Sequence, residues 1–199
     1  MRPRRVVTGH DAEGRPRIVG DDPLPRFVER AAIPGMADGV VWATPAVPGG
    51  PFDGADPTPG LSPLLPPAGE TRFNTVTFPP DSVFAAADFD PAAAAAENAA
   101  VIPELTPLMD PENPGMHRTP TVDYVIVLEG EVVLEMEGGE EAVLRQGDFV
   151  IQNATRHAWR NRSERPATLA VVMIGIAAGP RSHFRSDSEQ NCERAEGAR

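Results

Sequence analysis

The amino-acid sequence predicts an all-β fold, an antiparallel β-barrel or sandwich that occupies the second half of the chain. Short segments of apolar or alternating side chains follow one another from residue 115 to residue 178. Turn residues separate these segments every several positions, among them Gly130 and the pair Gly138 and Gly139. Short strands with such regular turn signals are typical of closed or double-sheet β architectures.

Six strands are predicted in this region. In residues 131–137 apolar and polar side chains alternate, and Gly138 and Gly139 then form a two-residue hairpin turn. Residues 166–176 form the last and most apolar strand. The other predicted strands are residues 123–128, 140–144, 149–151 and 157–162.

The first part of the chain is rich in turns. Residues 1–70 contain short apolar pieces at 5–8, 17–19 and 39–43 between proline and glycine pairs, so we expect a loop-rich extension that lies across the barrel or a neighbouring subunit. Alternation in residues 71–78 predicts a strand, with which a barrel domain of residues 71–178 begins. Pro91 behind Asp90 predicts a short helix to about residue 100, before the barrel proper.

The composition narrows the class of protein. A net charge of −11 disfavours nucleic acid and anionic membranes as partners. The single cysteine, Cys192, cannot form an internal disulfide, and no apolar run has the length of a signal peptide or a membrane span. We therefore expect a cytoplasmic protein with a small-molecule substrate and a polar, flexible tail at residues 179–199.

The polar side chains suggest a metal site. His117, Thr119 and Asp123 have the same parity and therefore point to one side of an extended chain, and His157, Trp159 and Asn161 share a side of a later strand. The two histidines and the aspartate are a ligand set that suits one divalent transition metal, with positions left open for substrate or water. The candidate substrate contacts on these faces are Thr119, Trp159 and Asn161.

The spacing of these residues resembles the cupins. The first cupin motif matches His117-x-Thr119-x3-Asp123-x6-Gly130, and the second matches Gly147 followed by His157-x3-Asn161. Here threonine stands in place of the second histidine and aspartate in place of the usual glutamate. The turn of the second motif also lacks its proline and glycine. The resemblance covers about a third of the chain, residues 115–178.

The resemblance implies a cupin-type jelly-roll barrel and a divalent metal such as Fe, Mn, Zn, Ni or Co, held by His117, Asp123 and His157. Thr119 would then hydrogen-bond a metal-bound water. The apolar strand at residues 167–176 predicts a homodimer, because pairing would cover its exposed face.

The function most consistent with this pattern is a metal-dependent enzyme that acts on a small oxygenated organic acid or carbonyl compound. The reaction would be a decarboxylation or another lyase reaction, or a dioxygenation. One alternative is a non-catalytic cupin that binds a metal, binds a small molecule without one, or only dimerises. Another is a metal-free sugar-nucleotide isomerase or epimerase, which would require a separate His–Asp acid–base pair.

Overall fold

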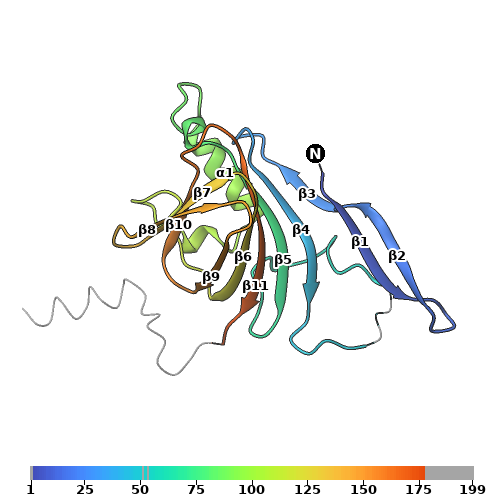
Figure 1. Cartoon of the computed structure of the whole chain (residues 1–199). Helices are drawn as coiled ribbons and strands as arrows, with labels where there is room; N and C mark the ends of the chain where they lie inside the picture. The colour runs from blue at the N-terminus through green and yellow to red at the C-terminus, as the bar shows by residue number, and fades with distance from the viewer. Residues whose placement is uncertain (1, 51, 53, 178–199) are drawn as a thin grey trace, which may run out of the picture.

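The protein is an all-β jelly-roll, as predicted (Figure 1). The computed structural model describes residues 2–50, 52 and 54–177, and the predicted tail with His183 and Cys192 lies outside these residues. Within the described residues the strands are β1 Arg4–His10, β2 Pro16–Pro23, β3 Arg26–Glu29, β4 Ala37–Thr44, β5 Thr71–Phe78, β6 Thr121–Glu129, β7 Glu131–Met136, β8 Glu141–Arg145, β9 Phe149–Asn153, β10 His157–Arg160 and β11 Ala167–Gly175. The helices are α1 Pro91–Val101 and the 3₁₀ helices η1 Asp81–Val83 and η2 Thr106–Leu108.

Two antiparallel sheets form the barrel. The larger sheet has the order β3-β4-β5-β11-β6-β9, and the smaller has the order β10-β7-β8. The predicted strand at residues 71–78 is confirmed as β5, and the six strands predicted after residue 115 correspond to β6–β11 with ends shifted by one or two residues. Gly138 and Gly139 have φ values of +113° and +87°, which allow the tight β7–β8 turn.

The interior of the barrel has two layers. The lower layer is apolar and joins both sheets through Val127 on β6, Val132 on β7 and Leu169 on β11, each at most 1% exposed. Burial of each such side chain stabilises the fold by about 1.5–3 kcal/mol. The upper layer contains buried polar side chains from the same strands, among them Thr121 and Asp123. The apolar core therefore fills one part of the barrel interior, and buried polar side chains occupy another.

The first 70 residues contribute more strand than their turn-rich sequence predicts. β4 pairs with β5, and β3, which the sequence pattern does not predict, pairs with β4 and forms one edge of the larger sheet. β1 and β2 form a separate hairpin that projects from the barrel on the right of Figure 1. The extension therefore widens the larger sheet instead of only lying across the barrel.

The predicted helix is confirmed as α1, and it is fixed to the β3–β4 hairpin. Asp90 caps it by accepting hydrogen bonds from the N–H groups of its first turn. Glu97 accepts hydrogen bonds of 2.8 and 2.9 Å from the backbone of residues 31 and 32. Beside it Arg30, 5% exposed, forms an ion pair with Asp38, and burial raises the pKa of that aspartate. Glu97 and Arg30 thus hold the helix against the edge of the sheet.

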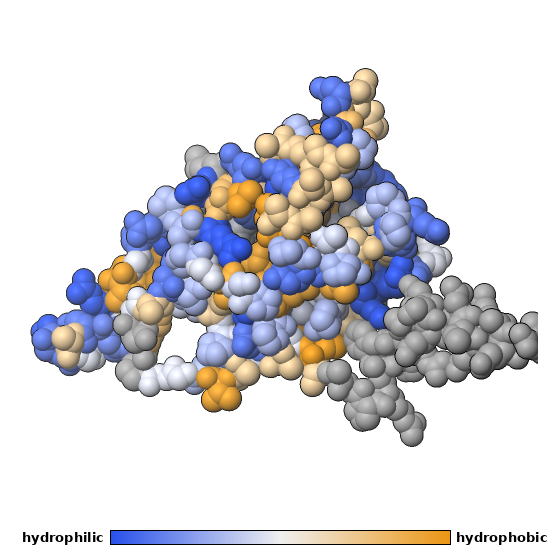
Figure 2. Space-filling view, turned by 180° about the vertical axis from the view of Figure 1, so that it is seen from behind, coloured by the Kyte–Doolittle hydropathy of each residue, from blue (hydrophilic) through white to orange (hydrophobic). Residues whose placement is uncertain are grey.

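The surface is mixed. From behind, hydrophilic side chains surround smaller apolar patches (Figure 2). Among the described residues, no helix has the length and apolar character needed to span a membrane.

Candidate functional site

The structure brings His117 and His157 together. Their backbones exchange two hydrogen bonds, of 2.9 and 3.0 Å, in an isolated antiparallel bridge. Residues paired in this way project their side chains to the same side, and the imidazole centroids lie 4.6 Å apart with the rings tilted by 49°. The two histidines that the parity argument selected are therefore neighbours inside the upper layer.

Each imidazole is held in one tautomer. His117 Nδ1 donates to the carbonyl of Gly115 over 2.9 Å, and His157 Nδ1 donates to the carbonyl of Thr155 over 3.0 Å. Because a carbonyl oxygen only accepts, both protons lie on Nδ1 and both Nε2 atoms keep their lone pairs. This backbone support is the arrangement found behind metal-binding histidines.

Both imidazoles favour the neutral form. Burial lowers the pKa of His117, against the bond to Gly115. Burial and the neighbouring His117 together lower the pKa of His157 to about 4. Near neutral pH both Nε2 atoms are therefore available as bases or metal ligands.

Asp123 is also buried, and its carboxyl group is bonded differently from the two imidazoles. It projects inward from β6, is 5% exposed, and its Oδ1 atom has no hydrogen-bond partner among the described residues. Burial raises its pKa to about 6, and a hydrogen bond from Thr121 acts in the opposite direction. Asp123 is thus a buried carboxyl group whose proton is gained and lost in a near-physiological range.

The structure does not gather a full set of metal ligands. Over residues 2–50, 52 and 54–177, no three side chains of His, Cys, Asp or Glu lie together as a metal-binding group. The side chain of Asp123 is one methylene shorter than the glutamate typical of the cupin motif, so it reaches less far toward the histidines. His117 and His157 supply two adjacent imidazoles, and the three-ligand metal site with Asp123 remains a prediction.

The candidate substrate contacts have different environments. Thr119 is 4% exposed, and its hydroxyl shares a 2.7 Å hydrogen bond with that of Thr121. Trp159 packs against the apolar core and places its ring edge-on to His157, with centroids 5.8 Å apart. The Trp159 ring therefore lies between the apolar core and the His157 imidazole.

Asn161 has a structural role. Its amide nitrogen donates to the carbonyls of Phe78 and Arg165, and its oxygen accepts from the backbone and hydroxyl of Ser163. These four bonds use the full hydrogen-bonding capacity of a carboxamide, which leaves it nothing to offer a substrate. Asn161 directly follows β10, and its hydrogen bonds to Ser163 and Arg165 fix the β10–β11 loop.

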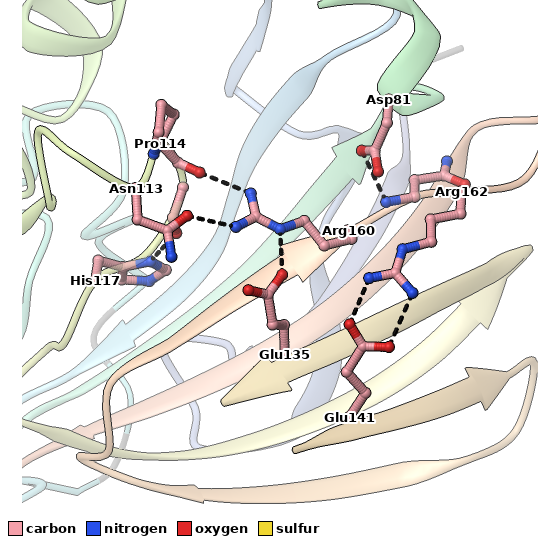
Figure 3. A network of polar contacts seen from close by, with 10 residues as sticks. Asp81, Asn113, Pro114, His117, Glu135, Glu141, Arg160 and Arg162 are labelled. Atoms are coloured by element: carbon pink, nitrogen blue, oxygen red, sulfur yellow. Dashed lines mark hydrogen bonds and ion pairs between the residues drawn. The ribbon is translucent and has the colours of Figure 1, made fainter. Parts of the chain in front are cut away.

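Arg160 supports the site from outside the barrel. Its guanidinium contacts Glu135 on β7 over 2.7 Å, the carbonyl of Pro114 over 2.6 Å and the side chain of Asn113 over 3.0 Å (Figure 3). These contacts fix the loop that carries the Gly115 carbonyl, the acceptor for His117. Arg160 therefore acts on the site indirectly, through the loop of residues 113–115.

We expect the substitution Arg160→Gln to release this loop and allow His117 to sample its second tautomer. Long-range ¹H–¹⁵N correlation spectra should show shifted or broadened His117 ring signals, while those of His157, held by Thr155, remain unchanged. Arg162→Gln is the matched control, because the Arg162 guanidinium donates its hydrogen bonds to Glu141 on β8 (Figure 3). Unchanged His117 signals in the Arg160 variant would contradict the supporting role.

The sequence pattern does not indicate two of the buried polar residues. Gln152 is 4% exposed and faces inward from β9. It is not predicted, because the predicted strand 149–151 ends one residue before it. In β9 the usual burial is reversed: the apolar Phe149 and Ile151 are exposed, and the polar Gln152 is buried. Arg72, which the sequence pattern leaves without a role, is 3% exposed and forms an ion pair with Glu70.

Comparisons with known proteins agree with this architecture. A family model described as the cupin domain matches residues 108–174. Residues of this chain are 51% identical over 67 positions to the oryzines biosynthesis cluster protein J of Aspergillus oryzae, which covers 34% of this chain and 37% of that protein. They are 48% identical over 46 positions to the cupin-domain-containing oxidoreductase virC of Hypocrea virens, which covers 23% of this chain and 24% of that protein.

The chain thus spans about a third or less of the length of these curated relatives. Among solved structures, a sugar phosphate isomerase from a cupin superfamily, from Silicibacter pomeroyi, aligns with a TM-score of 0.38 and 20% identity over 72% of this chain and 62% of that one.

Proposed function

Because residues 108–174 form a cupin domain, we propose that the protein is a small-molecule enzyme whose reactive centre is the pair His117 and His157. The observation that carries the proposal is the paired tautomer: two adjacent imidazoles, each with Nδ1 donating to a backbone carbonyl, so that Nε2 carries the lone pair. We propose that these two Nε2 atoms hold one divalent transition metal.

The reaction class follows from the relatives and the donor set. Several similar proteins are named cupin-domain-containing oxidoreductases, which favours oxidation of a small oxygenated organic acid or carbonyl compound over a decarboxylation or other lyase reaction. A bound divalent metal would supply Lewis acidity to a substrate oxygen and, if it is iron, access to dioxygen chemistry.

The protein's own residues have defined parts in this proposal. His117 and His157 stay neutral near pH 7, so both remain ligands or bases. Asp123 holds a proton below about pH 6 and releases it above, so it is the proposed proton carrier of the site. Trp159 shields the lower side of His157 from water.

We expect His157→Ala to lose bound metal while the barrel stays folded. Protein reconstituted with Fe(II), Mn(II), Zn(II) or Ni(II) and desalted would be measured by elemental analysis, with circular dichroism to follow folding. His10→Ala is the matched control, since His10 is exposed on β1 and should leave the metal content unchanged. Stoichiometric metal in the His157 variant would remove His157 from the centre.

The reaction class is tested separately. Dioxygen uptake with small keto acids and diols would support oxidation, whereas carbon dioxide release without dioxygen uptake would support a decarboxylase.

The second candidate function is a metal-free binding module. It is favoured by one observation, that the described residues gather no three-ligand group. Wild-type protein that binds none of the four metals but keeps its β-rich circular dichroism spectrum would select this function over the enzyme.

We also propose that the protein forms a homodimer through the outer face of the larger sheet. The cross-strand neighbours Phe73, Val172, Tyr124 and Ile151 form one row across β5, β11, β6 and β9, and three of them are 36–56% exposed. Sedimentation velocity should give a dimer, and Tyr124→Arg should shift it to monomer. A monomeric wild-type protein would contradict the proposal.

A further inference from the structure

Two buried polar atoms, on the neighbouring strands β6 and β9, have no hydrogen-bond partner among the described residues. Asp123 and Gln152 are directly paired in the antiparallel register. Their side chains are 5% and 4% exposed. Asp123 Oδ1 and Gln152 Nε2 have no hydrogen-bond partner among the described residues, and they do not bond each other.

Both side chains are held in place by neighbouring hydroxyl groups. Thr155 donates to Gln152 Oε1 over 2.5 Å, which leaves the amide N–H groups unused. Thr121 hydrogen-bonds the Asp123 carboxylate. An unpaired buried donor or acceptor is costly, so natural proteins almost always give such atoms a partner. The missing partner here must accept from an amide and donate to a carboxylate.

The donor and acceptor capacity of common ligand groups limits which group can bond both Asp123 and Gln152. A hydroxyl group offers one donor and two acceptor lone pairs on a single atom, and so it can serve both residues at once. A ligand carboxylate would place a second negative charge beside Asp123, and an ammonium group has no lone pair for Gln152.

We infer that Asp123 and Gln152 form a recognition site for one hydroxyl group of the substrate. This inference rests on the proposed function and deepens it: the substrate class becomes small hydroxy compounds, such as α-hydroxy ketones, rather than carbonyl compounds without a hydroxyl. Met173, the neighbour of Asp123 on β11, borders the site with an apolar side chain that offers no competing donor.

The test uses hydroxyacetone and acetone, which differ by one hydroxyl group. Dissociation constants would be measured by NMR titration of the full chain after treatment with a chelator. We expect hydroxyacetone to bind at least about tenfold more tightly than acetone, and Gln152→Met to abolish that difference. Gln146→Met is the matched control, because Gln146 is exposed in the β8–β9 turn.

Asp123→Leu separates this inference from the proposed function, because leucine offers neither a donor nor an acceptor to a hydroxyl group. The variant should lose the preference for hydroxyacetone but retain the metal content of the wild type. Loss of metal in this variant would make the metal the partner of Asp123 and overturn the inference. Equal binding of both probes by wild type, or a preference that survives in Gln152→Met, would also overturn it and assign the two atoms to an internal water. A hydroxyl preference in a protein that binds no metal would support the inference while rejecting the metal centre.

Discussion

Asp123→Asn is expected to stabilise the metal-free protein by about 3 kcal/mol at pH 8 and by less than about 1 kcal/mol at pH 4. Burial raises the pKa of Asp123 from 3.8 to about 6, so the native state holds this proton more tightly than the unfolded chain does. The protonated Asp123 carboxyl contributes to the stability of the wild type fully below pH 3.8. This contribution is lost as the pH rises through about 6. Asparagine resembles the protonated form at every pH and avoids this loss.

Urea unfolding at several pH values would measure the effect. His157 has the opposite behaviour, since its lowered pKa makes stability fall as the pH drops from 6.5 toward 4. To first order this contribution is common to wild type and variant, and it therefore cancels in their difference. Asp88→Asn, at an exposed position in the loop before α1, is the control and should change little. A stability difference independent of pH would show that Asp123 is not buried as a charged group.

Gly175→Ala is expected to destabilise the protein by about 3 kcal/mol or more. A Cβ atom at residue 175 would lie 2.0 Å from the carbonyl oxygen of Pro67 and 2.5 Å from that of Pro66. Both are backbone atoms that cannot rotate away, and they belong to the segment that pairs with the end of β11. The substitution must therefore push residues 66–70 off the barrel.

Thermal and urea unfolding of this variant would be compared with Gly60→Ala. No atom of the described residues lies within 4 Å of a Cβ at residue 60, so that variant isolates the general effect of adding a methyl group. A change below about 0.5 kcal/mol for Gly175→Ala would mean that the segment is not packed against β11 as described.

The sequence predicts the strands well because their signals are local. Alternation and glycine turns locate β6–β8, and Asp90 before Pro91 locates α1, since each pattern depends on neighbouring residues alone. β3 is only four residues long and follows Pro25, and its pairing with β4 is what makes it a strand. Non-local pairing of this kind leaves no pattern within the segment itself.

The candidate site shows the same difference between what local sequence patterns predict and what only the folded structure reveals. Parity brings His117 and His157 to one side correctly, because strand geometry fixes side-chain direction. It does not reveal how far a side chain reaches, which decides whether Asp123 joins the histidines. Nor does it reveal whether a polar group is already bonded, as the Asn161 carboxamide is, or has no partner among the described residues, as the Gln152 Nε2 atom has none.

The division of the barrel interior has a consequence for how such a protein can change over evolutionary time. Val125 and Val127 anchor β6 in the core, while Thr121 and Asp123, on the same face of that strand, are buried polar side chains. Mutations at the two upper positions can exchange one set of chemical groups for another while the anchoring valines keep the strand in register. Single substitutions can thus change the polar groups of the interior without the loss of the scaffold.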